Sequence, residues 1–151
     1  MTKKEILIAT TADLNDLIRL LNELFTQDIE FVPDYEKQKT GLEQILGNKD
    51  IGEILVLKID DKTIGMVSLL YSVSTALGGK VAILEDMVID SDYRFQGFGK
   101  ELLNEAIEFS KKRNCLRLTL LTDHNNNVAI SFYKSFGFKK SKMIPMRLIH
   151  K

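Results

Sequence analysis

The residues of this chain best suited to chemistry form the run Arg94-Phe95-Gln96-Gly97-Phe98-Gly99-Lys100. The run follows a β-branched apolar stretch that breaks at residues 90–92, and it opens a predicted helix. Because glycine has no Cβ, the backbone at Gly97 and Gly99 can turn tightly and approach a ligand closely. The unpaired N–H groups of a first helical turn bind anions. The run therefore predicts a cradle in which the main-chain amides of residues 95–100 hold a pyrophosphate.

Two other phosphate-binding loops are excluded by their spacing. A P-loop would need glycine where Arg94 stands and Ser or Thr where Glu101 stands. The dinucleotide fingerprint would need a third glycine at Leu102. Neither class of nucleotide-binding loop is therefore expected.

A second motif lies downstream and reads Asn126-x-x-Ala129-Ile130-x-Phe132-Tyr133-x-x-x-Gly137-Phe138. The two motifs, in this order and with a helix and a strand of ordinary length between them, closely resemble the GNAT (Gcn5-related) N-acetyltransferase superfamily. Motif-level similarity covers residues 81–138, and the first third of the chain carries no such signature. The resemblance implies a single α/β (α+β) domain over residues 1–151, with a mixed, mostly antiparallel sheet of about six to seven strands and about four flanking helices.

The resemblance also implies acetyl-CoA as the co-substrate. In GNAT proteins the strand before the cradle splays from its neighbour, which leaves main-chain groups free to pair with pantetheine; here these belong to Met87, Val88 and Ile89. Two roles are open for Arg94: its side chain contacts a phosphate, or it braces the loop. Asn126 matches a position that bonds the cofactor arm, and it is equally suited to capping the following helix.

Direct acetyl transfer to an amine requires loss of a proton, because an ammonium has no lone pair. By the resemblance, Glu85 is the expected proton acceptor, acting through water, and Tyr133 is the expected donor to the departing thiolate. Asp86 has the opposite strand parity, so it is expected to point to the other face of the sheet.

The acceptor is less clearly indicated. Residues 25–36 lie where GNAT proteins build the acceptor wall, and they combine the aromatic residues Phe25, Phe31 and Tyr35 with Asp28, Glu30, Asp34 and Glu36. This composition favours a small cationic amine. Polyamines, aminoglycosides, amino acids, peptide N-termini and lysine side chains all remain open, as does a CoA-binding sensor or interaction module without turnover.

Composition narrows the class of partner. The 151 residues include 44% hydrophobic residues, and 21 Lys and Arg balance 21 Asp and Glu, so no global field favours nucleic acid or an acidic membrane. The lack of a long apolar run or a signal-like start, with one cysteine, predicts a cytoplasmic protein. No cluster has metal-ligand spacing, so no metal is expected. A homodimer is an option, because dimers are common in the family the chain resembles.

Periodicity and turn residues place the secondary structure. Strands are predicted at residues 5–9, 53–59, 64–73, 81–89, 116–122 and 143–149. Helices are predicted at 14–24, around 42–46, at 97–113 and at 128–136. This order fits a central sheet with helices on both faces.

Overall fold

The computed structural model describes residues 2–27 and 31–151, and contacts divide the chain into two compact units, Met1–Leu121 and Thr122–Lys151. The elements of the first unit are β1 (Lys4–Ile8), η1 (Thr11–Asp13), α1 (Leu14–Gln27), α2 (Tyr35–Leu46), β2 (Gly52–Ile59), β3 (Lys62–Ser74), β4 (Gly79–Ile89), η2 (Ser91–Tyr93), α3 (Phe98–Lys112) and β5 (Leu118–Leu120). The second unit contains α4 (Asn127–Ser135).

The strands form one sheet in the order β1-β2-β3-β4-β5. The first three pairings are antiparallel, and β4 pairs in parallel with β5. The predicted mixed, mostly antiparallel sheet is confirmed, although the described residues form five strands rather than six to seven.

The strand predicted at residues 143–149 is wrong. This segment of the second unit contains no helix or strand, and its apolar side chains, including Met146 and Leu148, are exposed. A strand needs a hydrogen-bonded neighbour, and Pro145 within the segment removes one backbone donor. Apolar composition alone therefore did not produce a strand here.

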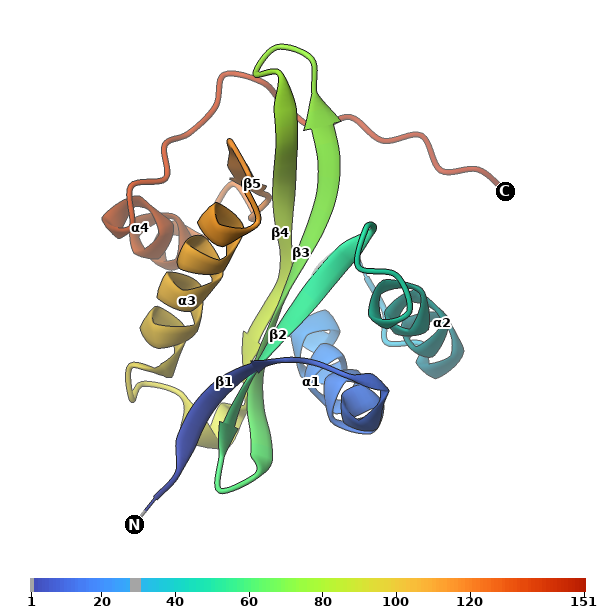
Figure 1. The fold of residues 1–151 in the computed structure, drawn as a ribbon, viewed down its shortest axis with the longest axis vertical. Helices are drawn as coiled ribbons and strands as arrows, with labels where there is room; N and C mark the ends of the chain where they lie inside the picture. Colours follow the sequence, from blue (N-terminus) through green and yellow to red (C-terminus); the bar gives the residue numbers. More distant parts are fainter. Residues whose placement is uncertain (1, 28–30) are drawn as a thin grey trace. The chain divides into compact units, whose positions relative to one another are not determined.

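Helices cover both faces of the sheet in the first unit (Figure 1). On one face, apolar side chains of α1 and α2 pack against Ile54, Val56, Met66 and Val88 of the strands. On the other face α3 contacts β2, β3 and β4, and it buries Leu102 completely. The predicted amphipathic helix and the α/β class are both confirmed.

Helix α2 begins earlier than predicted, at Tyr35 rather than near residue 42. It starts at Tyr35 because Asp34 caps it, accepting a hydrogen bond from Lys37 N at 3.2 Å. The Gln38 side chain accepts from Asp34 N at 2.7 Å and donates to Asn22 Oδ1 at 3.0 Å. Gln38 therefore fixes the start of α2 against α1.

A buried ion pair fastens the C-terminal end of α3 to the sheet. Arg113 donates from Nε and Nη2 to the two Glu53 carboxylate oxygens at 2.7 and 3.0 Å, and the Tyr71 hydroxyl donates to Oε1 at 2.8 Å. Burial alone would raise the pKa of Glu53, which is 4% exposed, but these hydrogen bonds outweigh it and the pKa lies below its ordinary value.

Replacing Arg113 with methionine should lower the free energy of unfolding by about 2–3 kcal/mol at neutral pH, because Glu53 then stays buried without its cation. This figure is at the low end for a broken buried pair, since the Arg113 side chain is 36% exposed and water reaches the pair. Urea unfolding of both proteins across pH measures the difference.

The pH dependence of that difference has a definite sign. In the wild type, ionised Glu53 contributes stability above its unfolded pKa, and this contribution is lost as the pH falls through the lower folded pKa. In the variant the buried charge is a cost that protonation removes, so the gap should shrink as the pH falls toward 4.5, the ordinary pKa of glutamate. Lys111→Met, which breaks an exposed pair with Glu108, is the control and should change stability little. An equal loss in both variants would contradict the role of the Glu53 pair.

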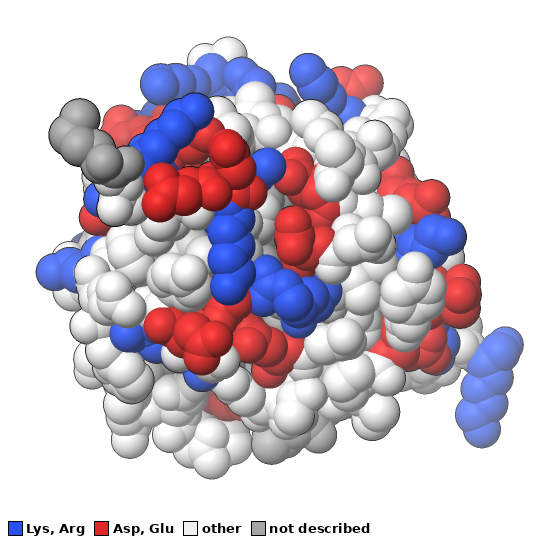
Figure 2. All heavy atoms as spheres, turned by 90° about the horizontal axis from the view of Figure 1, so that it is seen from below, with Lys and Arg blue, Asp and Glu red and all other residues white. Residues whose placement is uncertain are grey.

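Surface charge is mixed. Figure 2 shows one face of the molecule, on which acidic and basic side chains are interspersed without a broad field of either sign. That face offers no large basic surface to attract nucleic acid. Within the described residues, no helix combines the length and apolar character needed to cross a bilayer.

Candidate functional site

A bulge in β4 changes which side chains face the site. Glu85 pairs with Ser68 and Val88 pairs with Met66, so β4 carries one more residue than β3 between these pairs. Within the bulge, Asp86 has a φ of 51°. An extra residue breaks the two-residue alternation of a strand. The parity argument that turned Asp86 away from the acceptor side therefore fails.

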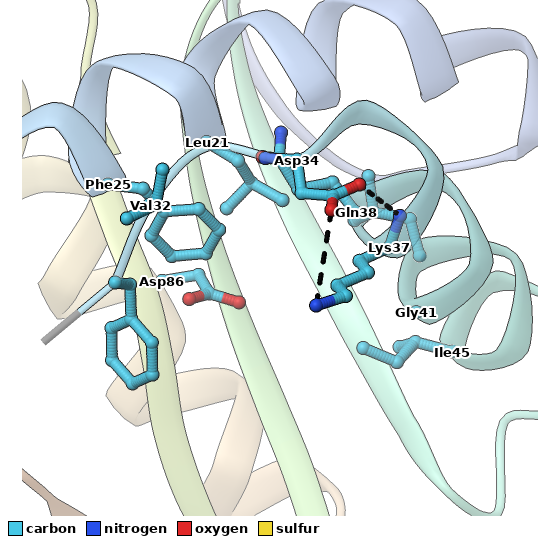
Figure 3. Close-up of a pocket in the computed structure, with 11 residues that line it drawn as sticks. Leu21, Phe25, Val32, Asp34, Lys37, Gln38, Gly41, Ile45 and Asp86 are labelled. Carbon is cyan, nitrogen blue, oxygen red and sulfur yellow. Dashed lines mark hydrogen bonds and ion pairs between the residues drawn. The ribbon is translucent and has the colours of Figure 1, made fainter.

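The Asp86 carboxylate instead points into a cavity of about 270 Å³ between α1, α2 and β4 (Figure 3). The described residues that line it are Leu21, Phe25, Phe31, Val32, Asp34, Lys37, Gln38, Gly41, Leu42, Ile45 and Asp86. Most of these are apolar, and the Phe25 and Phe31 rings lie 5.8 Å apart. The cavity is thus a largely apolar space with a carboxylate at the bulge.

The expected acceptor wall coincides only in part with the lining of this cavity. Phe25 and Phe31 line the cavity, whereas Tyr35 is exposed at the start of α2 and does not belong to the described lining. Among the acidic residues of this segment, Asp34 lines the cavity and pairs with Lys37 at 4.0 Å, and Glu36 is exposed. The predictions for Asp28 and Glu30 lie outside the described residues.

Glu85 and Asp86 are neighbouring carboxylates in different surroundings. Glu85 is exposed and lies opposite Ser68, on the sheet face that α1 and α2 cover. Burial, with a smaller contribution from the charge of Glu85, raises the pKa of Asp86 to about 6. A carboxyl group with a raised pKa beside a cavity is a candidate functional group. The sequence missed Asp86 because the bulge has no local signature.

The other edge of β4 is open where the cofactor was expected. β5 pairs with β4 only from Ala82 to Leu84, so among the described strands none pairs with Met87, Val88 or Ile89 on that side. Unpaired main-chain groups on a strand edge are available to an extended ligand. This geometry agrees with the expected splay and leaves the pantetheine contacts as a prediction.

The cradle follows directly after this edge. Phe95 and Gly97 both have left-handed backbone, with φ of 64° and 86°, and α3 begins at the next residue, Phe98. Alternating left-handed residues before a helix make a concave run of N–H groups that suits anions. Phe95 bears this conformation with a full side chain, which is fully exposed. This backbone geometry agrees with the predicted cradle, and pyrophosphate binding there stays a prediction.

Arg94 braces this loop. Its Nε donates to Ile89 O at 3.1 Å, and the side-chain oxygen of Gln27, in the amide orientation that satisfies both of its groups, accepts from the two terminal nitrogens at 3.0 Å. These bonds show the bracing role that the sequence left open. A phosphate contact from Arg94 stays a prediction.

The contact with Gln27 belongs to a row along α1 that sequence reasoning missed. Arg19 donates to Asp90 at 2.6 Å, and Glu23 accepts from the Ser91 hydroxyl at 3.1 Å. Arg19, Glu23 and Gln27 are spaced by four residues, so they share one helix face. That spacing was the available signal. One helix therefore carries Phe25 at the cavity and also supports the loop that leads to the cradle.

The second unit holds the remaining candidates. Asn126 caps α4, since its side chain accepts from Ala129 N at 3.1 Å, so the capping role is confirmed and the cofactor role stays a prediction. The Tyr133 ring packs edge-to-face against Phe132 and Phe138, at 5.4 and 5.8 Å between ring centroids. Burial raises the pKa of Tyr133 above its ordinary value, so the phenol keeps its proton at neutral pH. In the described part of the chain, no three His, Cys, Asp or Glu residues are grouped to hold a metal.

Comparison with known proteins gives a consistent family. A model described as acetyltransferase (GNAT) family matches residues 14–138. An uncharacterized N-acetyltransferase of Methanocaldococcus jannaschii is 27% identical over 136 residues, which cover 89% of this chain and 60% of that protein. A glucosamine 6-phosphate N-acetyltransferase of Trypanosoma brucei brucei is 30% identical over 79 residues, 52% of each chain. The chain thus matches between half and two thirds of the length of these two relatives.

Solved structures share the fold. A possible acetyltransferase from Clostridium difficile 630 superposes with a TM-score of 0.86 at 21% identity, covering 97% of this chain and 99% of that one. An aminoglycoside N-acetyltransferase in complex with CoA gives a TM-score of 0.81 at 14% identity, covering 100% and 97%. Given the match of the family model over most of its length, the chain belongs to the acetyltransferase (GNAT) family.

Proposed function

We propose that this chain is an acetyl-CoA-dependent N-acetyltransferase that transfers an acetyl group directly to the primary amine of a small cationic acceptor. The observation that carries the proposal is strand β4. Its bulge places Asp86 in a cavity of small-molecule size, and its open edge runs on into the glycine cradle. A donor held by phosphate and an acceptor amine would therefore meet along one strand. Membership of the acetyltransferase family supports this reading.

The residues present suit the donor. The amides of residues 95–100 would hold the pyrophosphate, and the free main-chain groups of residues 87–89 would pair with the pantetheine arm. Acetyl-CoA supplies the activated thioester. Arg94 contributes by holding the loop, and the Asn126 amide group keeps its N–H donors for the arm after its oxygen has capped α4.

Proton transfers accompany the acetyl transfer. An alkylammonium has a pKa of about 10.4, so Glu85 would accept its proton through water. The free amine then attacks the thioester carbonyl, the C–N bond forms and the C–S bond breaks. Tyr133 would give its proton to the departing thiolate, and the nitrogen would lose its second proton to solvent, from which the Tyr133 phenolate regains a proton. The raised pKa of Tyr133 keeps it in the protonated form that this role needs.

Incubation with acetyl-CoA and separate pools of small monoamines, polyamines, aminoglycosides, amino acids and peptides, followed by mass spectrometry, tests the proposal. An acetylated small amine above a protein-free control would support it. Acetylation of peptides alone would favour a protein or peptide acceptor; a relative from Escherichia coli, 37% identical over 60 residues, is a ribosomal protein bS18 alanine N-acetyltransferase. Binding of acetyl-CoA without any product would favour a sensor.

Replacing Gly97 with alanine should weaken acetyl-CoA binding by about 5- to 30-fold, because the free loop of the variant would relax from the left-handed backbone, and binding would have to restore it at a cost of about 1–2 kcal/mol. Gly97 has a φ of 86°, and no atom lies within 4 Å of the place that an alanine Cβ would occupy, so strain rather than a clash is the cause. Calorimetric titration measures the affinity. Gly78→Ala is the matched control, since Gly78 has a φ of 79° and equal space but lies in the turn before β4. If Gly78→Ala lost as much acetyl-CoA affinity as Gly97→Ala, the loss would not depend on the cradle, and the prediction would be contradicted.

A further inference from the structure

We propose that Asp86 binds the ammonium group of the acceptor while the neighbouring cavity takes a single apolar body, so that the acceptor is a primary monoamine of the arylalkylamine kind. This inference rests on the proposed acetyl transfer and adds its substrate class. It selects against the polyamines and aminoglycosides that the sequence left open.

The first argument is that Asp86 lacks a cation. The buried carboxylates of Asp13, Glu53 and Asp90 each contact a lysine or arginine, at 2.8, 2.7 and 2.6 Å. In the described part of the chain, no hydrogen bond or ion pair engages the carboxylate of Asp86. An ionised carboxylate in apolar surroundings is costly unless it is paired. The cavity therefore contains an unpaired carboxylate, and the cation of a ligand would pair with it.

The second argument is the distribution of charge around Asp86. From β4 the neighbouring charge is Glu85, and α1 presents only the apolar Leu21 and Phe25 to the cavity. From α2 the charged groups are Asp34 and Lys37, which pair with each other. Among the described lining residues, Asp86 is thus the carboxylate left without a cation, and it is ionised above a pKa of about 6.

The third argument is size and lining. An apolar cavity of about 150 Å³ holds benzene, so the present volume of about 270 Å³ admits an aromatic ring with a short alkyl chain. The second and third ammonium groups of a polyamine would lie against Leu42 and Ile45, and the one other carboxylate among the described lining residues, Asp34, already pairs with Lys37. The several polar rings of an aminoglycoside would face the same apolar walls. One cation on one apolar body fits both the charge and the space.

Calorimetric titration of the full chain with phenethylamine at pH 8, with and without CoA, tests the inference. Asp86→Asn should weaken binding by about 10- to 100-fold, the usual loss for a charge-assisted hydrogen bond. The uncharged analogue phenylethanol should bind the wild type and the variant alike. Asparagine tolerates left-handed backbone, so the variant should keep its fold, and its thermal unfolding midpoint at pH 8 should not fall. The exposed Asp50, in the turn before β2, provides the matched control Asp50→Asn, which should bind phenethylamine normally.

The pH supplies a further readout. As the pH falls from 8 to 5, Asp86 gains a proton while the amine stays charged, so wild-type affinity should fall below about pH 6. The affinity of Asp86→Asn should change little over that range.

Three results would each overturn the inference. They are normal binding of phenethylamine by Asp86→Asn, tighter binding of spermidine than of phenethylamine, and no phenethylamine binding with or without CoA. Acetylation of spermidine alone would overturn it while leaving the proposed function intact. If phenethylamine binds normally but no amine is acetylated, the proposed function fails while the inference about Asp86 stands.

Discussion

Replacing Glu85 with glutamine should lower kcat for amine acetylation by about 10²–10⁴-fold, the usual contribution of a general base. Glutamine keeps the size of the side chain and cannot accept the proton. Because Glu85 is exposed and does not line the cavity, KM for the amine should change less than kcat. Steady-state rates at saturating acetyl-CoA measure both constants.

The same variant makes a second effect observable. The charge of Glu85 helps to raise the pKa of Asp86, so its removal should shift the acidic loss of amine affinity to lower pH. Glu108→Gln, an exposed change at the far end of α3, is the control and should leave both readouts unchanged. A Glu85→Gln enzyme with a normal kcat would reject the base assignment and leave Asp86 as the next carboxylate to test.

Tyr133→Phe should also lower kcat by about 10²–10⁴-fold, because the departing thiolate loses its proton donor. The edge-to-face packing with Phe132 and Phe138 needs only the aromatic ring, so the fold should be kept. Acetyl-CoA affinity, measured by titration, should stay close to that of the wild type.

Changing the thiol leaving group of the donor tests whether Tyr133 acts as a proton donor or only through packing. A thioester donor whose thiol is more acidic needs less help from a proton donor, so it should partly restore the rate of Tyr133→Phe. Tyr35→Phe, which removes an exposed hydroxyl outside the described cavity lining, should behave as wild type with both donors. A uniform rate loss with both donors would indicate that Tyr133 acts through packing.

The bulge explains the main error in the predicted site. Strand parity assumes that successive side chains alternate, and this holds for the regular part of β3 against β4. Between the Ser68–Glu85 pair and the Met66–Val88 pair the register shifts, and Asp86 turns into the cavity. A register depends on two strands together, so the residues of β4 alone did not reveal it.

The contacts of Arg94 in the cradle loop could not be predicted from the local sequence either. The sequence left two roles open for Arg94, and its partners, Ile89 O and the Gln27 side chain, come from β4 and from a helix far away in the chain. The start of α2 was missed for a different reason. The cap by Asp34 is local and was readable, but the apolar spacing that predicted the helix begins only at Leu42.

The sequence by itself determined the family, the tight turn at Gly97, the helix that follows it and the capping of α4. Each of these depends on residues close together in the chain, where backbone preference and side-chain periodicity act directly. Only the tertiary structure decided which of two adjacent carboxylates faces the cavity, that Phe25 and Phe31 line it while Tyr35 does not, and that Arg94 braces the loop. These outcomes depend on how β3 pairs with β4 and on how α1 and α2 pack over them, and such long-range contacts have no signature in a local stretch of sequence.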